Sequence, residues 1–139
     1  MKKLLLIFPV LLCLLAFVVP NAQAAAVYVN SSDQQGSAAV NEQTNDDAFV
    51  VGNLVNVTAP VGSELFAAGN VVSITKLGRR SNYVAGNTVT LSGTYGHDVY
   101  AAGNSIIVKE GTVINGDLRI SGSVVDISGT IKGSVYASG

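Results

Sequence analysis

The pair Gly-Asn recurs along this chain at one constant interval. Its four copies are Gly52-Asn53, Gly69-Asn70, Gly86-Asn87 and Gly103-Asn104. The glycine phase continues at Gly122, after an insertion of two positions, and at Gly139, where the original interval returns. A constant period of roughly 20 residues among β-branched neighbours is typical of solenoids. The sequence therefore predicts an all-β fold, a parallel β-helix solenoid with coils of about 17 residues.

Apolar residues occupy the positions four and two before each glycine, and again three and five after it. Residues two apart on a strand point to the same face, so each pair of columns marks an inner face. Before the glycine the columns are Ala48, Leu65, Asn82, Val99, Leu118, Val135 and Val50, Ala67, Val84, Ala101, Ile120, Ala137. After it they are Val55, Val72, Val89, Ile106, Val125 and Val57, Ile74, Leu91, Val108, Ile127. A further column of Val61, Tyr95 and Ile131, interrupted by Gly78, indicates a third short strand in each coil.

The Gly-Asn pairs mark a corner of the coil. The glycines fit a position that requires either a positive φ or a close approach of two backbones. The asparagines allow two interpretations. Their amides could form a hydrogen-bonded ladder along the axis, or asparagine could simply tolerate a left-handed turn.

The N-terminus resembles an export signal. Lys2 and Lys3 precede an apolar run from Leu4 to Val19, and Ala22 and Ala24 form a small-x-small cleavage site. We expect residues 1–24 to be a signal peptide, 25–45 a polar linker or N-terminal cap, and 46–139 the repeat domain. Export would place the protein in the periplasm, in the cell envelope or outside the cell.

Removal of the signal would leave six basic and nine acidic residues, because Lys2 and Lys3 are lost, for a net charge near −3. This charge argues against nucleic acid as a partner. Cys13, the sole cysteine, would also be lost, so no disulfide would support the fold. The sequence shows no recognisable combination of catalytic residues. His97 is the only histidine, and its neighbour Asp98 should point to the opposite side of a strand.

Acidic residues share the column five before the glycine. They are Asp47, Glu64, Asp98 and Asp117. Calcium could use stacked carboxylates, but solvated residues at a bend explain them better. We therefore expect no catalytic site, no metal and no cofactor.

Aromatic residues share the column three before the glycine. They are Phe49, Phe66, Tyr83, Tyr100 and Tyr136, with Arg119 in the remaining row. Because this column alternates with inner-face columns, we expect it to point outward. Such a row either stabilises itself by stacking or presents an exposed surface for a partner.

The last coils carry a family resemblance. Ile114 to Gly122 reads I-N-G-D-L-R-I-S-G, and Val124 to Val135 reads V-V-D-I-S-G-T-I-K-G-S-V. These motifs, together with Glu64 to Ile74 (E-L-F-A-A-G-N-V-V-S-I), resemble the bactofilin family of polymer-forming cytoskeletal proteins over residues 46–139. The resemblance implies a right-handed β-helix that polymerises end to end without nucleotide and associates with membranes. The export signal departs from the cytoplasmic members of the family.

The first hypothesis is a self-assembling scaffold of the bacterial cell envelope, with itself as the main partner and membrane or cell-wall components as further ones. The alternative is a secreted, adhesin-like solenoid that binds a glycan or protein through its aromatic row. The repeat runs up to Gly139, and the given sequence shows no capping element after it. Terminal coils normally need one, so we expect either a C-terminal truncation or a second molecule at this end.

Overall fold

A computed structural model describes residues 26–29, 36–75 and 78–139. The predicted signal peptide and its cleavage residues, Ala22 and Ala24, lie outside the described residues. Every strand pair in the described part is parallel, and none of its elements is a helix. Accordingly, the described residues contain no helix able to cross a membrane.

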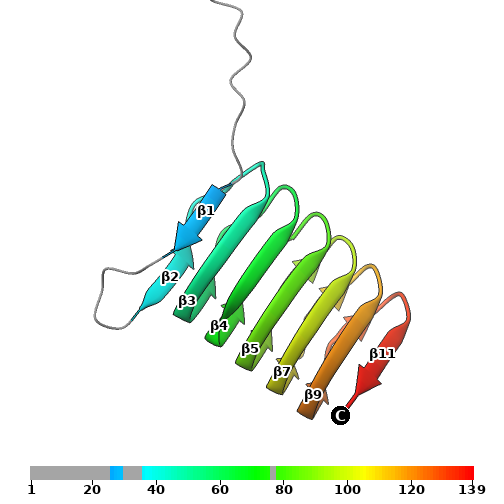
Figure 1. The fold of residues 1–139 in the computed structure, drawn as a ribbon. Coiled ribbons are helices and arrows are strands. Elements are labelled where there is room, and N and C mark those ends of the chain that lie inside the picture. Colours follow the sequence, from blue (N-terminus) through cyan, green and yellow to red (C-terminus); the bar gives the residue numbers. More distant parts are fainter. Residues whose placement is uncertain (1–25, 30–35, 76–77) are drawn as a thin grey trace, which may run out of the picture.

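Long strands follow each other side by side at the period of the repeat (Figure 1). They are β3 (Ala48–Val57), β4 (Leu65–Ile74), β5 (Asn82–Leu91), β7 (Val99–Val108) and β9 (Leu118–Ile127). The shorter strand β11 (Val135–Ser138) pairs with β9. Together with β1 (Ala26–Val29) and β2 (Ser37–Val40), these strands form one parallel sheet.

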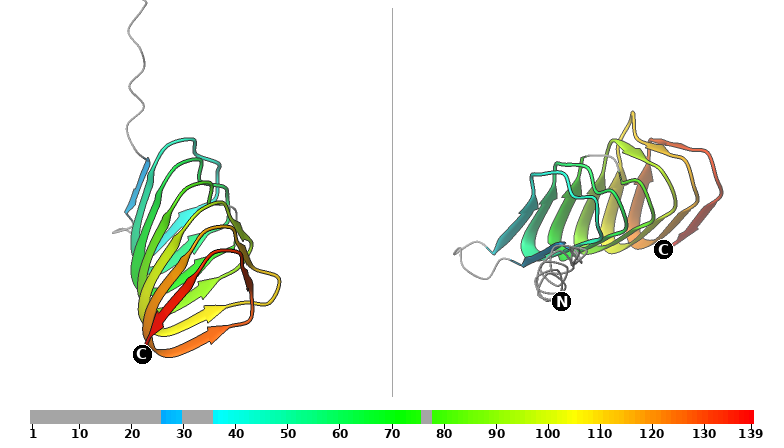
Figure 2. Two further views of the ribbon diagram at one scale, coloured as in Figure 1. Left: turned by 90° about the vertical axis from the view of Figure 1, so that its right-hand side faces the viewer. Right: turned by 90° about the horizontal axis from the view of Figure 1, so that it is seen from above.

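A second, narrow sheet closes the other side of each coil. It contains β6 (Thr94–Tyr95), β8 (Val113–Ile114) and β10 (Thr130–Ile131). Single bridges from Thr44 through Val61 and Gly78 to Tyr95 continue it toward the N-terminus. Figure 2 shows the coils following one another along a common axis. The predicted fold is therefore confirmed as a parallel β-solenoid, with about six turns.

The core lies inside the coils and contains the predicted aliphatic columns. Val72, Val89 and Ile106 pair in register as one row, and each is fully buried. Burying each such side chain stabilises the fold by about 1.5–3 kcal/mol. One coil alone could not bury these side chains, so the coils must stack. Toward the C-terminal end the column becomes more exposed, because Val125 and Ile127 are only partly buried.

The long strands continue through the glycine column, whereas the sequence predicted two short strands on either side of a corner. Gly52 pairs with Gly69, Gly69 with Gly86 and Gly86 with Gly103 inside these strands. None of these four glycines has a positive φ. A Cβ added at Gly86 would lie 2.8 Å from the carbonyl oxygen of Gly69. Close backbone approach is therefore the reason for glycine in this column.

Neither interpretation of the asparagine column holds. Asn53, Asn70, Asn87 and Asn104 are exposed, and within the described part of the chain no hydrogen bond joins their amides. None of the described non-glycine residues has a positive φ, which excludes the left-handed turn. The pairing register skips these positions, since Gly52 pairs with Gly69 and Leu54 with Val71. The asparagine side chains are therefore exposed and form no hydrogen-bonded ladder among the described residues.

Gly78 and Asn82 are exceptions to two of the apolar columns, and each accounts for the presence of the other. Asn82 is buried in an otherwise apolar column, and its Nδ2 donates a hydrogen bond to the Arg80 carbonyl at 2.8 Å. A Cβ at Gly78 would collide with the Asn82 amide. Gly78 thus leaves the space that the amide fills, while Asn82 Oδ1 has no hydrogen-bond partner among the described residues.

Two strands lie in the segment 25–45, for which a polar linker or N-terminal cap was expected. β1 pairs with the first half of β3, and β2 pairs with its second half. Ala38 and Val40 of β2 are buried in the core. This segment thus contributes strand pairing to the N-terminal side of β3.

Candidate functional site

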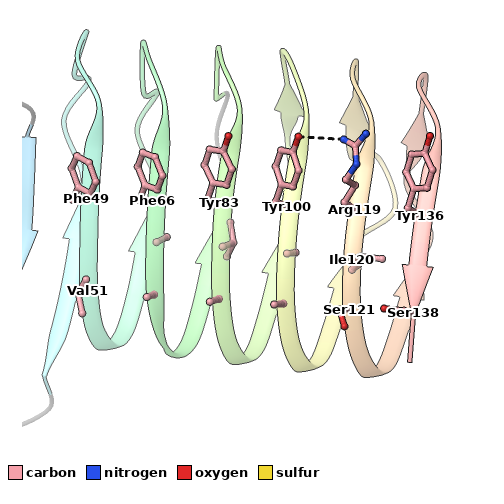
Figure 3. A pocket seen from close by; sticks show the side chains of 16 residues that line it. Phe49, Val51, Phe66, Tyr83, Tyr100, Arg119, Ile120, Ser121, Tyr136 and Ser138 are labelled. Atoms are coloured by element: carbon pink, nitrogen blue, oxygen red, sulfur yellow. Dashed lines mark hydrogen bonds between the residues drawn. The ribbon is translucent and has the colours of Figure 1, made fainter.

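The aromatic column forms a continuous stack on the outside of the large sheet (Figure 3). Its neighbours Ala48 and Val50 are fully buried, so alternation directs Phe49 outward. The ring centroids of Phe49 and Phe66 lie 4.8 Å apart, and those of Phe66–Tyr83 and Tyr83–Tyr100 lie 4.9 Å apart. The interplanar angles are 3°, 6° and 11°. In-register pairing of parallel strands produces this stack, because its spacing matches the distance between strands.

Arg119 continues the stack where the aromatic residue is missing. Its guanidinium carbon lies 5.4 Å from the ring centroid of Tyr100 and 4.9 Å from that of Tyr136. Its Nη1 also donates a hydrogen bond to the Tyr100 hydroxyl at 3.3 Å. A planar guanidinium can stack on aromatic faces on both sides, which an ammonium group cannot do. We call these six residues the aromatic stripe: Phe49, Phe66, Tyr83, Tyr100, Arg119 and Tyr136.

Two carboxylates compensate the charge of Arg119. Its Nη2 lies 3.1 Å from Oδ2 of Asp117, and its Nη1 lies 3.7 Å from Oδ2 of Asp98. Both salt bridges of the described residues therefore involve Arg119. The arginine side chain is 40% exposed, so these ion pairs orient it more than they stabilise the fold.

The acidic column connects successive coils through hydrogen bonds. The backbone N–H of Glu64 donates to Asp47, that of Asp117 to Asp98, and that of Ser134 to Asp117, at 3.1, 2.8 and 2.9 Å. The Ser63 hydroxyl, followed by the Glu64 N–H, lowers the pKa of Asp47 below its ordinary value. Among the described residues, no three His, Cys, Asp or Glu side chains are grouped as metal ligands. His97 is exposed at the bend before Asp98.

A second column of the same strands is small where the aromatic stripe is large. It lies two residues further along each strand, one position before the glycine, and pairs in register from coil to coil. We call it the small-residue column: Val51, Ala68, Ala85, Ala102, Ser121 and Ser138. The two columns line an open, predominantly apolar groove of about 790 Å³ that runs along the solenoid axis.

The stack determines which part of each ring is accessible. Neighbouring rings cover one another's faces, so mainly ring edges and tyrosine hydroxyls point to solvent. Phe49 at one end is 38% exposed and Tyr136 at the other end is 55% exposed. The surface is therefore a long apolar ridge beside a shallow floor, and such patches are typical of protein contacts.

The sequence predicted the five aromatic positions of this site but not its other parts. The pattern marks Arg119 only as the exception in the column. The small-residue column is absent from the sequence predictions, although its period is as regular as that of the glycines. No protein-family model matches the chain, and neither the curated proteins nor the solved structures include one with significant similarity to it.

Proposed function

We propose that this protein is a structural, self-assembling β-solenoid scaffold of the bacterial cell envelope. The observation that carries the proposal is the aromatic stripe beside an apolar groove, repeated at every coil of the large sheet. Covering an apolar surface of this kind with another protein lowers the free energy of the system. Every added coil extends the surface by one similar unit. We propose no catalytic role for this protein.

The geometry of the stripe favours a protein partner over a glycan. A sugar ring that packs on an aromatic side chain needs a free ring face. In this stack the faces of Phe66 and Tyr83 are covered on both sides by their neighbours. A protein surface with a ridge of its own, in contrast, can pack against the ring edges and the alanine floor together.

Two parts of the proposal rest on the sequence alone. The expected export signal at 1–24 gives the location in the envelope. The resemblance to bactofilins gives assembly without nucleotide, with membrane or cell-wall components as additional partners. The structure supports the scaffold itself through its repeated coils and its exposed stripe.

Negative-stain electron microscopy together with sedimentation velocity tests this function. The full coding sequence is expressed in a bacterium, and the protein is purified and studied without nucleotide at micromolar concentrations. We expect self-association, from side-by-side pairs of rods through the stripe to filaments where the coils also meet end to end. Monodisperse single rods over the whole concentration range would contradict the scaffold, and binding of a soluble oligosaccharide by those rods would favour the adhesin-like alternative.

A further inference from the structure

The aromatic stripe and the small-residue column are complementary to each other. Each side chain of the stripe after Phe49 has an alanine or a serine two positions further along the same strand, about 7 Å away, and Phe49 has Val51 there. Both columns have the same spacing along the axis, because the same strands carry them. One face of this molecule therefore contains both a ridge and the floor that a ridge of equal period would need.

We propose that a second copy of this chain docks on this face with its coils parallel to those of the first. This inference rests on the proposed function and specifies its geometry. A two-fold axis parallel to the solenoid axis reverses the strand direction and exchanges the two columns. The stripe of each copy then lies over the small-residue column of the other, and each coil meets its own equivalent. Such a contact is closed and self-complementary.

The side chains match coil by coil in this arrangement. Tyr83 and Tyr100 would lie over Ala85 and Ala102 of the second copy, where alanine leaves room for a ring. At the N-terminal end, Phe49 would cover Val51, which is 50% exposed in the single chain. At the other end the polar members coincide: Arg119 would meet Ser121, and Tyr136 would meet Ser138. Each serine hydroxyl can accept a hydrogen bond from the stripe.

The other two-fold arrangement lacks this match. An axis parallel to the strands makes the coils antiparallel and places stripe against stripe. Arg119 of one copy would then face Phe66 of the other when the two faces overlap fully. The salt bridges to Asp98 and Asp117 would be desolvated there without a new polar partner.

The size of the face predicts a weak pair. Six coils at about 4.8 Å and two columns give a patch roughly 29 Å long and 14 Å wide, or about 400 Å² per copy. The total of about 800 Å², before corrugation is counted, is below the roughly 1,200–2,000 Å² of stable specific interfaces and falls in the range of weak, transient contacts. The dimer should therefore dissociate on dilution.

Single cysteines on the small-residue column test the geometry. The background is the full chain with Cys13→Ser, and the variants are Val51→Cys and Ser121→Cys. In the parallel pair the two copies of either cysteine lie about 10 Å apart, within reach of a short bis-maleimide. In the antiparallel pair the two copies of position 51 are separated by about 24 Å along the axis. Lys132→Cys, which is exposed on the narrow-sheet side, is the control.

We expect Val51→Cys and Ser121→Cys each to cross-link to a second copy of itself, and Lys132→Cys not to. Ala85→Glu should weaken the dimer at least about tenfold, because a carboxylate would be buried in the groove, whereas Lys132→Glu should not. Oligomers that cross-link only when Val51→Cys is mixed with Ser138→Cys would overturn this geometry but leave the scaffold function standing. A protein that is monomeric throughout would overturn both.

Discussion

The guanidinium carbon of Arg119 lies 4.9 Å from the ring centroid of Tyr136, so a cation fills the one gap in a column of aromatic rings. On its other side the same group contacts Tyr100, at 5.4 Å. The stripe thus spans six coils without interruption although only five of its members are aromatic. Arg119 connects the last coil of the described structure to the coils before it.

Replacing Arg119 with alanine should lower the free energy of unfolding by about 1–2 kcal/mol. Two cation–π contacts at a half-exposed site contribute about 0.5–1 kcal/mol each, and the surface ion pairs contribute little more. Arg119→Lys should lose most of this stabilisation, because an ammonium keeps the charge but not the stacked plane. Arg119→Tyr, which completes the aromatic column, should retain it. Urea unfolding followed by circular dichroism measures all three, and equal midpoints for Arg119→Ala and the parent would refute the role of stacking.

Gly86→Ala should destabilise the protein by about 2–3 kcal/mol or more. The added Cβ would lie 2.8 Å from the Gly69 carbonyl oxygen and 3.1 Å from a Val72 methyl, so two paired strands would have to separate. The matched control is the next residue. Asn87→Ala should change the stability by less than about 0.5 kcal/mol, because the Asn87 side chain is exposed and no amide ladder includes it. Similar losses for both variants in thermal or urea unfolding would contradict the assigned reason for the glycine column.

Tyr95 should make the fold sensitive to alkaline pH. Burial raises the pKa of its phenol well above the ordinary value of 10, and the neutral hydroxyl donates a hydrogen bond to the Ile74 carbonyl at 3.4 Å. A group whose folded pKa is raised contributes stability that is complete below its unfolded pKa. That contribution is lost as the pH rises from about 10 toward the folded pKa.

Tyr95→Phe should therefore cost about 1 kcal/mol at neutral pH but show a shallower loss of stability above pH of about 10 than the parent. Tyr83→Phe is the control for removing a phenol hydroxyl outside the core, because the half-buried Tyr83 lies on the outer stripe. Denaturant midpoints measured across this pH range give the slopes. If Tyr95→Phe has the same slope as the parent, another group is responsible for the alkaline loss.

The period of the sequence correctly predicted the rows of side chains that arise when coils stack in register. Val72, Val89 and Ile106 form one buried row, and the aromatic residues form one outer row, because every coil repeats its predecessor. The period could not predict exceptions that depend on a neighbouring coil. Asn82 is accommodated only because Gly78 leaves space beside it, and no pattern along the chain connects the two.

The N-terminal strands show where the repeat becomes hard to follow. β1 pairs with β3 outside the common period, whereas β2 pairs with β3 at that period. The additional residues between β1 and β2 interrupt the 17-residue period of the repeat. The polar composition of the segment therefore suggested a linker. Ala38 and Val40 nevertheless lie one full period before Val55 and Val57, so the inner-face column could have been extended to them.

Arg119 was harder to place from the sequence. A cation in an aromatic column belongs to the stack only if its guanidinium lies between the rings of the neighbouring coils. That placement depends on the conformation of a long side chain, which the period does not determine. The ion pairs with Asp98 and Asp117, one from the preceding coil and one from its own, help to hold it there.

The most direct test of the account is sedimentation velocity of the full chain beside its variant Phe66→Thr/Tyr83→Thr/Tyr100→Thr. Threonine keeps the β-propensity of these strand positions but removes the ridge. Circular dichroism and the unfolding midpoint of the variant confirm that the coils are still formed. We predict that the variant sediments as smaller species than the parent at the same concentration, because the side-by-side pairing through the stripe is lost. Oligomers of unchanged size in a folded variant would show that the aromatic stripe is not the contact surface.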